Sequence, residues 1–155
     1  MTDPNTIHKE IIVNASEESA FSVFTKGFDS WWPRVQHCGK PPLKEFVLEP
    51  YLGGRWHEIY VGGSECDWGR VIAWEPPVRF ALTWQITEDY EFDPNLRTEV
   101  EVTFESLGAN KTRVILEHKH LDRFGENADE IKIGKDAGWG TIMPLFAAAV
   151  EKASK

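Results

Sequence analysis

Glu58 is the first residue whose position in the chain indicates chemistry. It alternates with Trp56 and Tyr60, so in a strand these three side chains share one face. We take this face as the inward one, because the alternation continues out of the turn at Gly53-Gly54. Desolvation disfavours the charged form of a carboxylate among apolar side chains, so Glu58 is a candidate acid or ligand anchor. The alternative is a Glu58 that lies at the open rim or pairs with an arginine, since buried unpaired Glu is rare.

His118 follows the same logic on a later stretch of the chain. It alternates with the apolar residues of 114–116, so we expect it to point inward, with His120 nearer the mouth. Imidazole titrates near neutral pH, so Glu58 and His118 together would form an acid/base pair for proton transfer. The alternative is a core histidine that is hydrogen-bonded by Tyr60 or a backbone carbonyl and has no chemical role.

Other kinds of chemistry lack support in the sequence. There is no G-x-S-x-G elbow and no H-E-x-x-H motif. Cys38 and Cys66 lie 28 residues apart and so have no C-x-x-C spacing. The Gly-Gly pairs lack the strand and helix that flank a nucleotide loop. We therefore expect no metal, no cofactor and no catalytic nucleophile.

The N-terminal part of the chain predicts a strand and then two short helices. Residues 7–13 are rich in β-branched side chains, and Ser16 is a natural N-cap for a helix that begins directly after it. Apolar residues over 20–28 have helical spacing, and Gly27 is placed to end or bend that helix. We expect a loop over 34–42.

From 44 to 120 the apolar residues recur with a period of two, which predicts a sheet. Gly62-Gly63 predicts a tight hairpin turn, Pro76-Pro77 another turn, and 87–95 a long hairpin loop. The predicted strands are 46–48, 56–60, 67–75, 80–84, 99–105 and 113–120.

After residue 120 the period returns to 3.6 residues. We expect a short helix at about 126–133, a break over the glycines near 134–140, and a terminal amphipathic helix from about 137 to 152. Pro144 would lie in a first turn or kink the helix. An antiparallel meander with one apolar face buries that face most simply by curling around such a helix, which gives an α+β fold. Pockets form between a curved sheet and a helix.

Seven tryptophans are the conspicuous feature of the composition, and six of them fall between residues 31 and 84. Trp56 and Trp84 have inward parity, Trp139 lies on the dry stripe of the last helix, and Trp31-Trp32 follow the short helices. They would line a cavity or simply fill a core, because aromatic side chains serve both. In a regular strand Trp68 and Trp74 point to the same side as Arg70, so we expect them on the outside or at a rim. Exposed indoles there would indicate a protein interface.

The overall composition narrows the class of protein. The 155 residues suit a single domain over 1–155, and 17 basic against 25 acidic residues disfavour nucleic acid as a partner. No window approaches 18 apolar residues, so we expect no membrane insertion. The first residues carry neither a positive n-region nor an apolar h-region, so we expect a cytoplasmic protein with both cysteines reduced.

Several segments in this order resemble the START-like, or SRPBCC, helix-grip superfamily of the birch pollen allergen. Within it the chain is similar to the C-terminal domain of the activator of the heat-shock-protein-90 ATPase. The matching segments are Ala15–Thr25 with Trp31-Trp32-Pro33, Gly53–Trp56, Trp68–Val71 with Trp74–Pro77, Arg79–Trp84, Thr112–Val114 and Gly138–Ala149. The resemblance implies a curved antiparallel sheet of about seven strands around a long C-terminal helix, with two short helices after strand one.

The resemblance also implies a cavity between the sheet and the C-terminal helix. Relatives bind sterols, flavonoids, hormones or polyketides, so we expect a small hydrophobic, aromatic or lipid ligand. The expected ligand-binding residues are Trp56, Glu58, Tyr60, Phe80, Trp84, Val102, Leu116, His118, Trp139, Met143 and Phe146. One alternative is a cyclase or hydrolase that uses Glu58 and His118, as some enzymes of this fold do. Another is a co-chaperone-like interaction module, although we expect no counterpart here of the eukaryotic activator's separate N-terminal domain. A chaperone partner and self-association stay open as alternatives, although the sequence shows no heptads or long edge strand that would support self-association.

Overall fold

The computed structural model describes residues 4–33, 42–87, 89 and 91–153. Its elements follow the order β1 (Ile7–Val13), α1 (Glu17–Thr25), α2 (Phe28–Trp31), β2 (Leu43–Leu48), β3 (Arg55–Tyr60), β4 (Glu65–Glu75), β5 (Arg79–Trp84), β6 (Thr98–Gly108), β7 (Lys111–Lys119), the 3-10 helix η1 (Leu121–Phe124) and α3 (Ala128–Ala153). The predicted strand, the two short helices and the six further strands are all present. Most of the predicted loop 34–42 lies outside the described residues.

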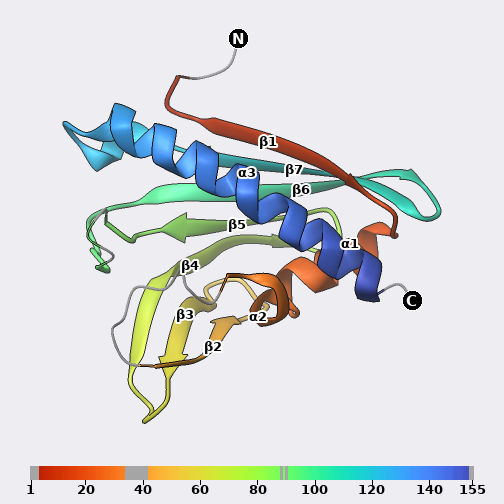
Figure 1. Ribbon diagram of the computed structural model, residues 1–155, viewed down its shortest axis with the longest axis horizontal. Coiled ribbons are helices and arrows are strands. Elements are labelled where there is room, and N and C mark those ends of the chain that lie inside the picture. The colour runs from red at the N-terminus through yellow and green to blue at the C-terminus, as the bar shows by residue number, and fades with distance from the viewer. Residues whose placement is uncertain (1–3, 34–41, 88, 90, 154–155) are drawn as a thin grey trace.

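All seven strands form one antiparallel sheet in the order β1-β7-β6-β5-β4-β3-β2. The sheet curls, so that β2 to β4 turn away from the direction of β1, β7 and β6, while α3 crosses one face of the sheet and ends beside α1 (Figure 1). Alternation on β6 and β7 buries one face of each strand, which is the concave face under α3. This is the helix-grip arrangement, and the predicted α+β fold class is confirmed.

The break that we expected in the C-terminal helix is absent. Residues 128–153 form one helix of 26 residues, and Pro144 lies in its interior rather than in a first turn. A glycine costs about 1 kcal/mol in a helix interior. Burying one large apolar side chain contributes roughly 1.5–3 kcal/mol, and α3 buries five residues: Trp139, Ile142, Met143, Phe146 and Val150. Packing therefore outweighs the local preference to break.

The expectation that Trp68 lies outside is wrong, because β4 contains two bulges. Against β3, Trp68 is the extra residue, since Trp56 pairs with Gly69 and His57 with Asp67. An extra residue reverses the alternation of side chains along a strand. Trp68 is accordingly 4% exposed and lies in the core.

A second bulge turns Trp74 inward as well. Val71 pairs with Leu82 and Ala73 with Ala81, which leaves Ile72 as the extra residue. Trp74 is half-buried, and its ring centroid lies 5.1 Å from that of Phe21 in an edge-on contact. The exposed pair of indoles that would have indicated a protein interface is therefore not formed.

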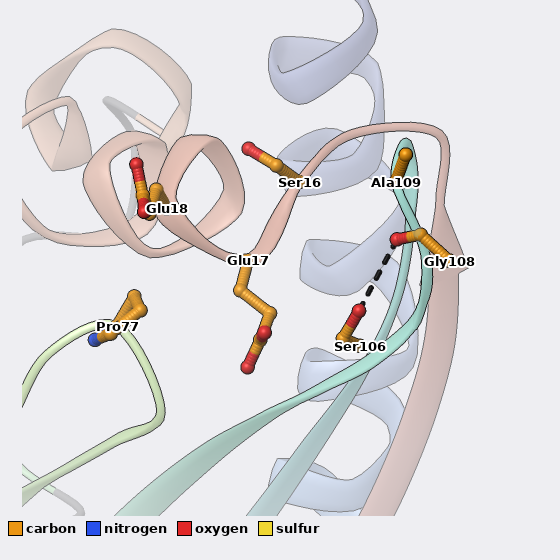
Figure 2. Close-up of a pocket in the computed structure, with 7 residues that line it drawn as sticks. All are labelled: Ser16, Glu17, Glu18, Pro77, Ser106, Gly108 and Ala109. Atoms are coloured by element: carbon orange, nitrogen blue, oxygen red, sulfur yellow. Dashed lines mark hydrogen bonds between the residues drawn. The ribbon is translucent and has the colours of Figure 1, made fainter.

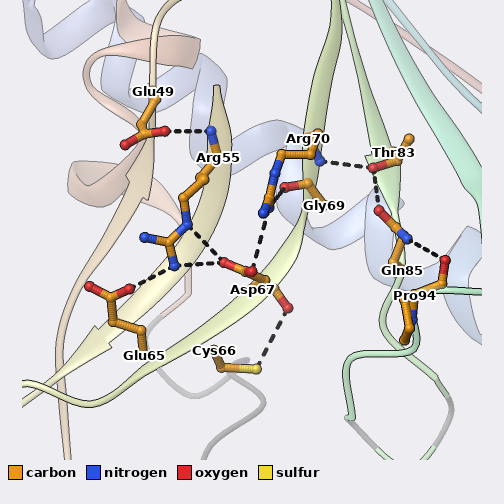
Figure 3. Close-up of polar contacts among 10 residues, drawn as sticks. All are labelled: Glu49, Arg55, Glu65, Cys66, Asp67, Gly69, Arg70, Thr83, Gln85 and Pro94. Carbon is orange, nitrogen blue, oxygen red and sulfur yellow. Dashed lines mark hydrogen bonds and ion pairs between the residues drawn. The ribbon is translucent and has the colours of Figure 1, made fainter. Parts of the chain in front are cut away.

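Polar contacts hold the first bulge in place (Figure 3). The backbone N–H of Arg70 donates to the Thr83 hydroxyl oxygen at 2.8 Å, and that hydroxyl donates to Gln85 Oε1 at 2.7 Å. On the outer face of the sheet, Asp67 accepts from Arg55 at 2.7 Å and pairs with Arg70 at 3.5 Å. The Thr83 side chain of β5 thus accepts from the backbone of β4 two residues after the bulge.

The expectation of two reduced cysteines is wrong for Cys66. This residue, half-buried on β4, is in a disulfide. The other cysteine of the sequence, Cys38, lies outside the described residues.

Gly69 supplies a test of the bulge. A Cβ atom there would lie 2.0 Å from the backbone oxygen of Thr83. We expect Gly69→Ala to destabilise the protein by about 3 kcal/mol or more, because forcing extra atoms into a packed site costs roughly 1–3 kcal/mol even where side chains can yield. Urea unfolding monitored by circular dichroism measures the change.

The matched control is Gly134→Ala on the exposed side of α3, where a Cβ atom would meet no atom within 4 Å. This substitution should stabilise the protein by roughly 0.5–1 kcal/mol. A Gly69→Ala variant as stable as the parent would contradict the bulge.

Candidate functional site

The concave face carries two aromatic groups of different chemistry. The first, which we call the phenylalanine cluster, lies near α1 and consists of Phe21, Phe24, Phe80, Phe104 and Phe146. Its nearest indole, Trp31, donates its N–H to the backbone oxygen of Val23 at 2.9 Å. This cluster consists of hydrocarbon rings packed together, which is typical of a core.

The second group, the indole cluster, consists of Trp32, Trp56, Trp68, Trp84 and Trp139. Trp84 is its centre, with ring centroids 5.4 Å from Trp56, 5.6 Å from Trp68 and 5.9 Å from Trp139. The cluster joins the C-cap of α2, three strands and α3, and two of its indoles are hydrogen-bonded to Glu58 and His118. The predicted division of the tryptophans therefore needs revision: Trp68 belongs with Trp56, Trp84 and Trp139.

Glu58 is 0% exposed and lies on the same face as Trp56 and Tyr60, as the alternation on β3 predicted. Its Oε1 accepts a hydrogen bond from the Tyr60 hydroxyl, and its Oε2 accepts one from the Trp68 Nε1–H at 2.7 Å. Each carboxylate oxygen therefore has a donor from a neighbouring aromatic side chain. In this geometry Glu58 positions the rings around it.

His118 is also 0% exposed, on β7 beneath α3. Trp139 Nε1–H donates to Nδ1 at 3.2 Å, so the proton of the ring must be on Nε2. Nε2–H then donates to the Thr98 hydroxyl oxygen at 2.9 Å, and that hydroxyl donates to the Trp84 backbone oxygen at 2.8 Å. Burial, with the nearby charge of Lys135, holds the pKa of His118 well below its usual value, so the ring is neutral.

Sequence reasoning missed Lys135, a charged side chain that α3 places on the indole cluster. Its Nζ lies 4.6 Å from the ring centroid of Trp84 and 5.4 Å from that of Phe124. Desolvation lowers its pKa to about 8. The signal was in the sequence, because Lys135 precedes Trp139 by four residues and so shares the dry stripe of the helix.

Two indole N–H groups of the cluster have no acceptor. Trp56 Nε1 and Trp84 Nε1 are buried without a hydrogen-bond partner, and their ring centroids lie 5.4 Å apart. The N–H groups of Trp68 and Trp139 are bonded to Glu58 and His118. The cluster thus holds two adjacent donors that nothing in the described part of the chain satisfies.

The other predicted lining residues divide between the two groups. Val102, Leu116 and Met143 are buried on the concave face. Phe80 and Phe146 make their ring contacts in the phenylalanine cluster. His120 lies half-buried, and its Nε2 is 2.8 Å from a carboxylate oxygen of Glu99.

A groove of about 330 Å³ lies elsewhere, at the start of α1 (Figure 2). It is lined by Ser16, Glu17, Glu18, Pro77, Ser106, Gly108 and Ala109. Ser16 caps α1 by accepting from the Ser19 N–H at 3.2 Å. None of the predicted site residues borders this groove.

The described ranges hold neither a metal-type cluster nor a membrane-spanning helix. There, no three or more His, Cys, Asp or Glu side chains gather as they would around a metal ion. No helix among those residues combines the length and apolar character needed to span a bilayer.

The helix-grip sheet and the polar groups beneath α3 define a protein of the START-like, or SRPBCC, class, which is a ligand-binding fold. Residues 14–151 match the family model described as "Activator of Hsp90 ATPase homolog 1-like protein", and the chain belongs to that family. A comparison with curated proteins finds no match.

Several solved structures are similar. The anthrahydroquino-gamma-pyrone synthase Txn09 is 37% identical, with 84% of this chain and 86% of that chain covered and a TM-score of 0.59. CalC, a self-sacrificing resistance protein from Micromonospora echinospora, is 31% identical, with 96% and 95% covered and a TM-score of 0.71. The Aha1 dimer from Colwellia psychrerythraea, at 18% identity, 94% and 96% coverage and a TM-score of 0.65, shows the shared fold alone.

The burial of neutral His118 predicts a loss of stability in acid. As the pH falls through the ordinary pKa of 6.5, the unfolded chain takes up a proton at His118 that the folded protein does not. The free energy of unfolding should then fall by about 1.4 kcal/mol per pH unit from this group alone. Urea unfolding of the parent and of His118→Gln at pH 7, 6 and 5 measures the difference in slope.

His8→Gln is the control, since Glu10 raises the pKa of this exposed histidine and the sign of its effect is opposite. The His8→Gln substitution should not reduce the slope of the free energy of unfolding against pH. Equal slopes for the parent and His118→Gln would show that His118 is protonated in the folded state.

Proposed function

We propose that the protein binds a small planar aromatic molecule with acceptor oxygens, such as an anthraquinone, against the indole cluster between the curved sheet and α3. The observation that carries this proposal is the pair of buried indole N–H groups without acceptors, on Trp56 and Trp84. The ligand's carbonyl or hydroxyl oxygens would accept from them, and its rings would stack among the indoles.

The energetic argument is that an unsatisfied buried donor costs roughly 1–3 kcal/mol. Native proteins pair more than nine-tenths of such groups. The N–H groups of Trp68 and Trp139 are paired, and so is the Thr98 hydroxyl next to His118, which donates to the Trp84 backbone oxygen. Two adjacent exceptions in such a network indicate donors kept for a molecule that arrives from outside.

The helix offers room beside these rings. Gly138 is half-buried on the stripe of α3 that carries Lys135 and Trp139, yet a Cβ atom there would meet no atom within 4 Å. Position 138 therefore leaves room for atoms beyond those of the described residues. We infer that the ligand extends along α3 at this position.

The proposed binding residues keep the predicted set and extend it. Trp56, Trp84 and Trp139 would contact the rings of the ligand, and Glu58 and His118 would orient the indoles rather than touch the ligand themselves. The remaining predicted wall residues are Tyr60, Phe80, Val102, Leu116, Met143 and Phe146. To these we add Trp32 and Trp68.

The similarity to the anthrahydroquino-gamma-pyrone synthase supports this ligand class, because at 37% identity the two chains share most of their length. The same similarity favours a second candidate function, a cyclase-type reaction on such a ligand. In that function Glu58 and His118 would act as acid and base. Both are hydrogen-bonded to aromatic or hydroxyl groups of the protein, so a substrate would have to displace these partners. Binding is therefore the function that the geometry supports best.

Paired probes test the proposal. Anthraquinone-2-carboxamide carries two ring carbonyl oxygens that anthracene-2-carboxamide lacks, and we expect it to bind about tenfold more tightly, since one hydrogen bond is worth roughly 0.5–1.5 kcal/mol. Isothermal titration calorimetry measures both affinities. Trp56→Phe and Trp84→Phe each remove one donor and should reduce the preference.

Trp31→Phe is the matched control, because the Trp31 N–H is already bonded to Val23 within the phenylalanine cluster. It should leave the preference for the quinone intact. Equal affinity of the parent for the two probes, or no binding of either, would contradict the proposed role of the indole donors.

Filling the space at Gly138 gives an independent test. Gly138→Leu should weaken binding of anthraquinone-2-carboxamide at least tenfold, because its side chain occupies the proposed ligand volume. Gly134→Leu, one turn earlier on the exposed side of α3, should bind like the parent. If both variants bind normally, the ligand does not lie along this part of the helix.

A further inference from the structure

Lys135 holds a positive charge against the indole cluster in an unusual way. Its Nζ lies 4.6 Å from the centre of the Trp84 ring and 5.4 Å from that of Phe124, between β5, η1 and α3. A lysine normally extends its ammonium group into water. Here the group is largely desolvated and is directed at the ring whose N–H lacks an acceptor.

The charged neighbours of Lys135 are engaged elsewhere. On α3, Asp136 pairs with Lys9 of β1 at 3.2 Å, and Lys132 donates to the backbone oxygen of Pro4 at 2.5 Å. At the end of β7, His120 bonds to Glu99 of β6. Within the described residues, Lys135 makes no ion pair with a carboxylate.

No described carboxylate acts on Lys135: the Glu58 oxygens accept from Tyr60 and Trp68, and desolvation is the cause of the lowered pKa of Lys135. His118, which faces Lys135 from β7, is neutral. From β5 and η1, Lys135 meets the faces of aromatic rings. A cation over an aromatic ring gains about 0.5–2 kcal/mol, which compensates only partly for a desolvated ammonium group.

We propose that Lys135 anchors an ionised oxygen of the ligand, so that the protein selects aromatic acids, meaning molecules with a phenolate, enolate or carboxylate, over neutral aromatic molecules of the same shape. This inference rests on the proposed function, because it assigns one end of a ligand held by the indole cluster. The acceptor oxygens of the ring system would meet the indole N–H groups, and the anionic oxygen would meet Lys135 Nζ.

The titration of Lys135 gives the proposal a second signature. Desolvation lowers its pKa to about 8, and an anion within hydrogen-bond distance would raise it again. At pH 8 about half of the Lys135 side chains are protonated in the free protein, so binding of an anion should take up about half a proton. His118 adds no proton at this pH because its pKa is lowered.

Two probes of one shape test the selection. Anthraquinone-2-carboxylate and anthraquinone-2-carboxamide differ in charge and little in size. By isothermal titration calorimetry the parent protein should bind the carboxylate about tenfold more tightly, because a hydrogen bond to a charged group is stronger than a neutral one. Titrations at pH 8 in buffers of different ionisation enthalpy should show proton uptake for the carboxylate alone.

Lys135→Met and Lys132→Met make a matched pair of variants, since both remove one positive charge from α3. Lys135→Met should bind the two probes equally and take up no proton, whereas Lys132→Met should behave like the parent. Retained preference in Lys135→Met, or equal binding of the two probes by the parent, would overturn the anchoring role of Lys135 while the proposed binding function stands. If the parent binds neither probe, the proposed function itself fails.

Discussion

A buried indole N–H group needs a hydrogen-bond acceptor, and the rest of the structure depends on how this need is met. A tryptophan contributes more apolar surface than any other side chain, and each one buried also brings a donor that is costly to leave unpaired. Five of them meet at the indole cluster. Glu58 and His118 are the two groups that make this packing tolerable, since each accepts from one indole, Trp68 or Trp139. A carboxylate and an imidazole that resemble catalytic groups in sequence thus serve first as acceptors.

This constraint explains why the sheet departs from regular alternation where it does. Without the bulge at Trp68 the indole would point outward and Glu58 would lose a donor. The bulge in turn requires Gly69, where a side chain would collide with the backbone of β5, and the Thr83 hydroxyl, which accepts from the Arg70 backbone N–H. The outer network of Arg55, Asp67 and Arg70 fixes the same segment from the solvent side (Figure 3).

Much of this was predictable from the sequence because the relevant signals are local. A period of two placed the strands and the inward faces of Glu58 and His118, and glycine and proline pairs placed the turns. Bulges are different, because a single extra residue is defined only by its partner strand, so Trp68 and Trp74 were placed on the wrong face. The expected break near Gly134 failed for a related reason: the glycines lower helix propensity locally, but burial of Trp139 and Phe146 decides the outcome. Lys135 was missed because a single charged residue on the apolar face of a helix does not fit the pattern of apolar residues that defines this face.

The two aromatic groups of the concave face differ in the polar groups that they must satisfy. The phenylalanine cluster has nothing to satisfy, so it packs at no polar cost and holds α1 and α3 to the sheet. If the indole cluster existed only to fill space, phenylalanine at positions 56 and 84 would do so without an orphaned donor, and methionine at position 135 would cover Trp84 without a desolvated charge. Retaining Trp56, Trp84 and Lys135 together costs stability in the free protein. In the proposed function that cost is recovered when one molecule supplies two acceptors and an anion at the same place, so the unpaired groups, rather than the well-bonded Glu58 and His118, would select the ligand.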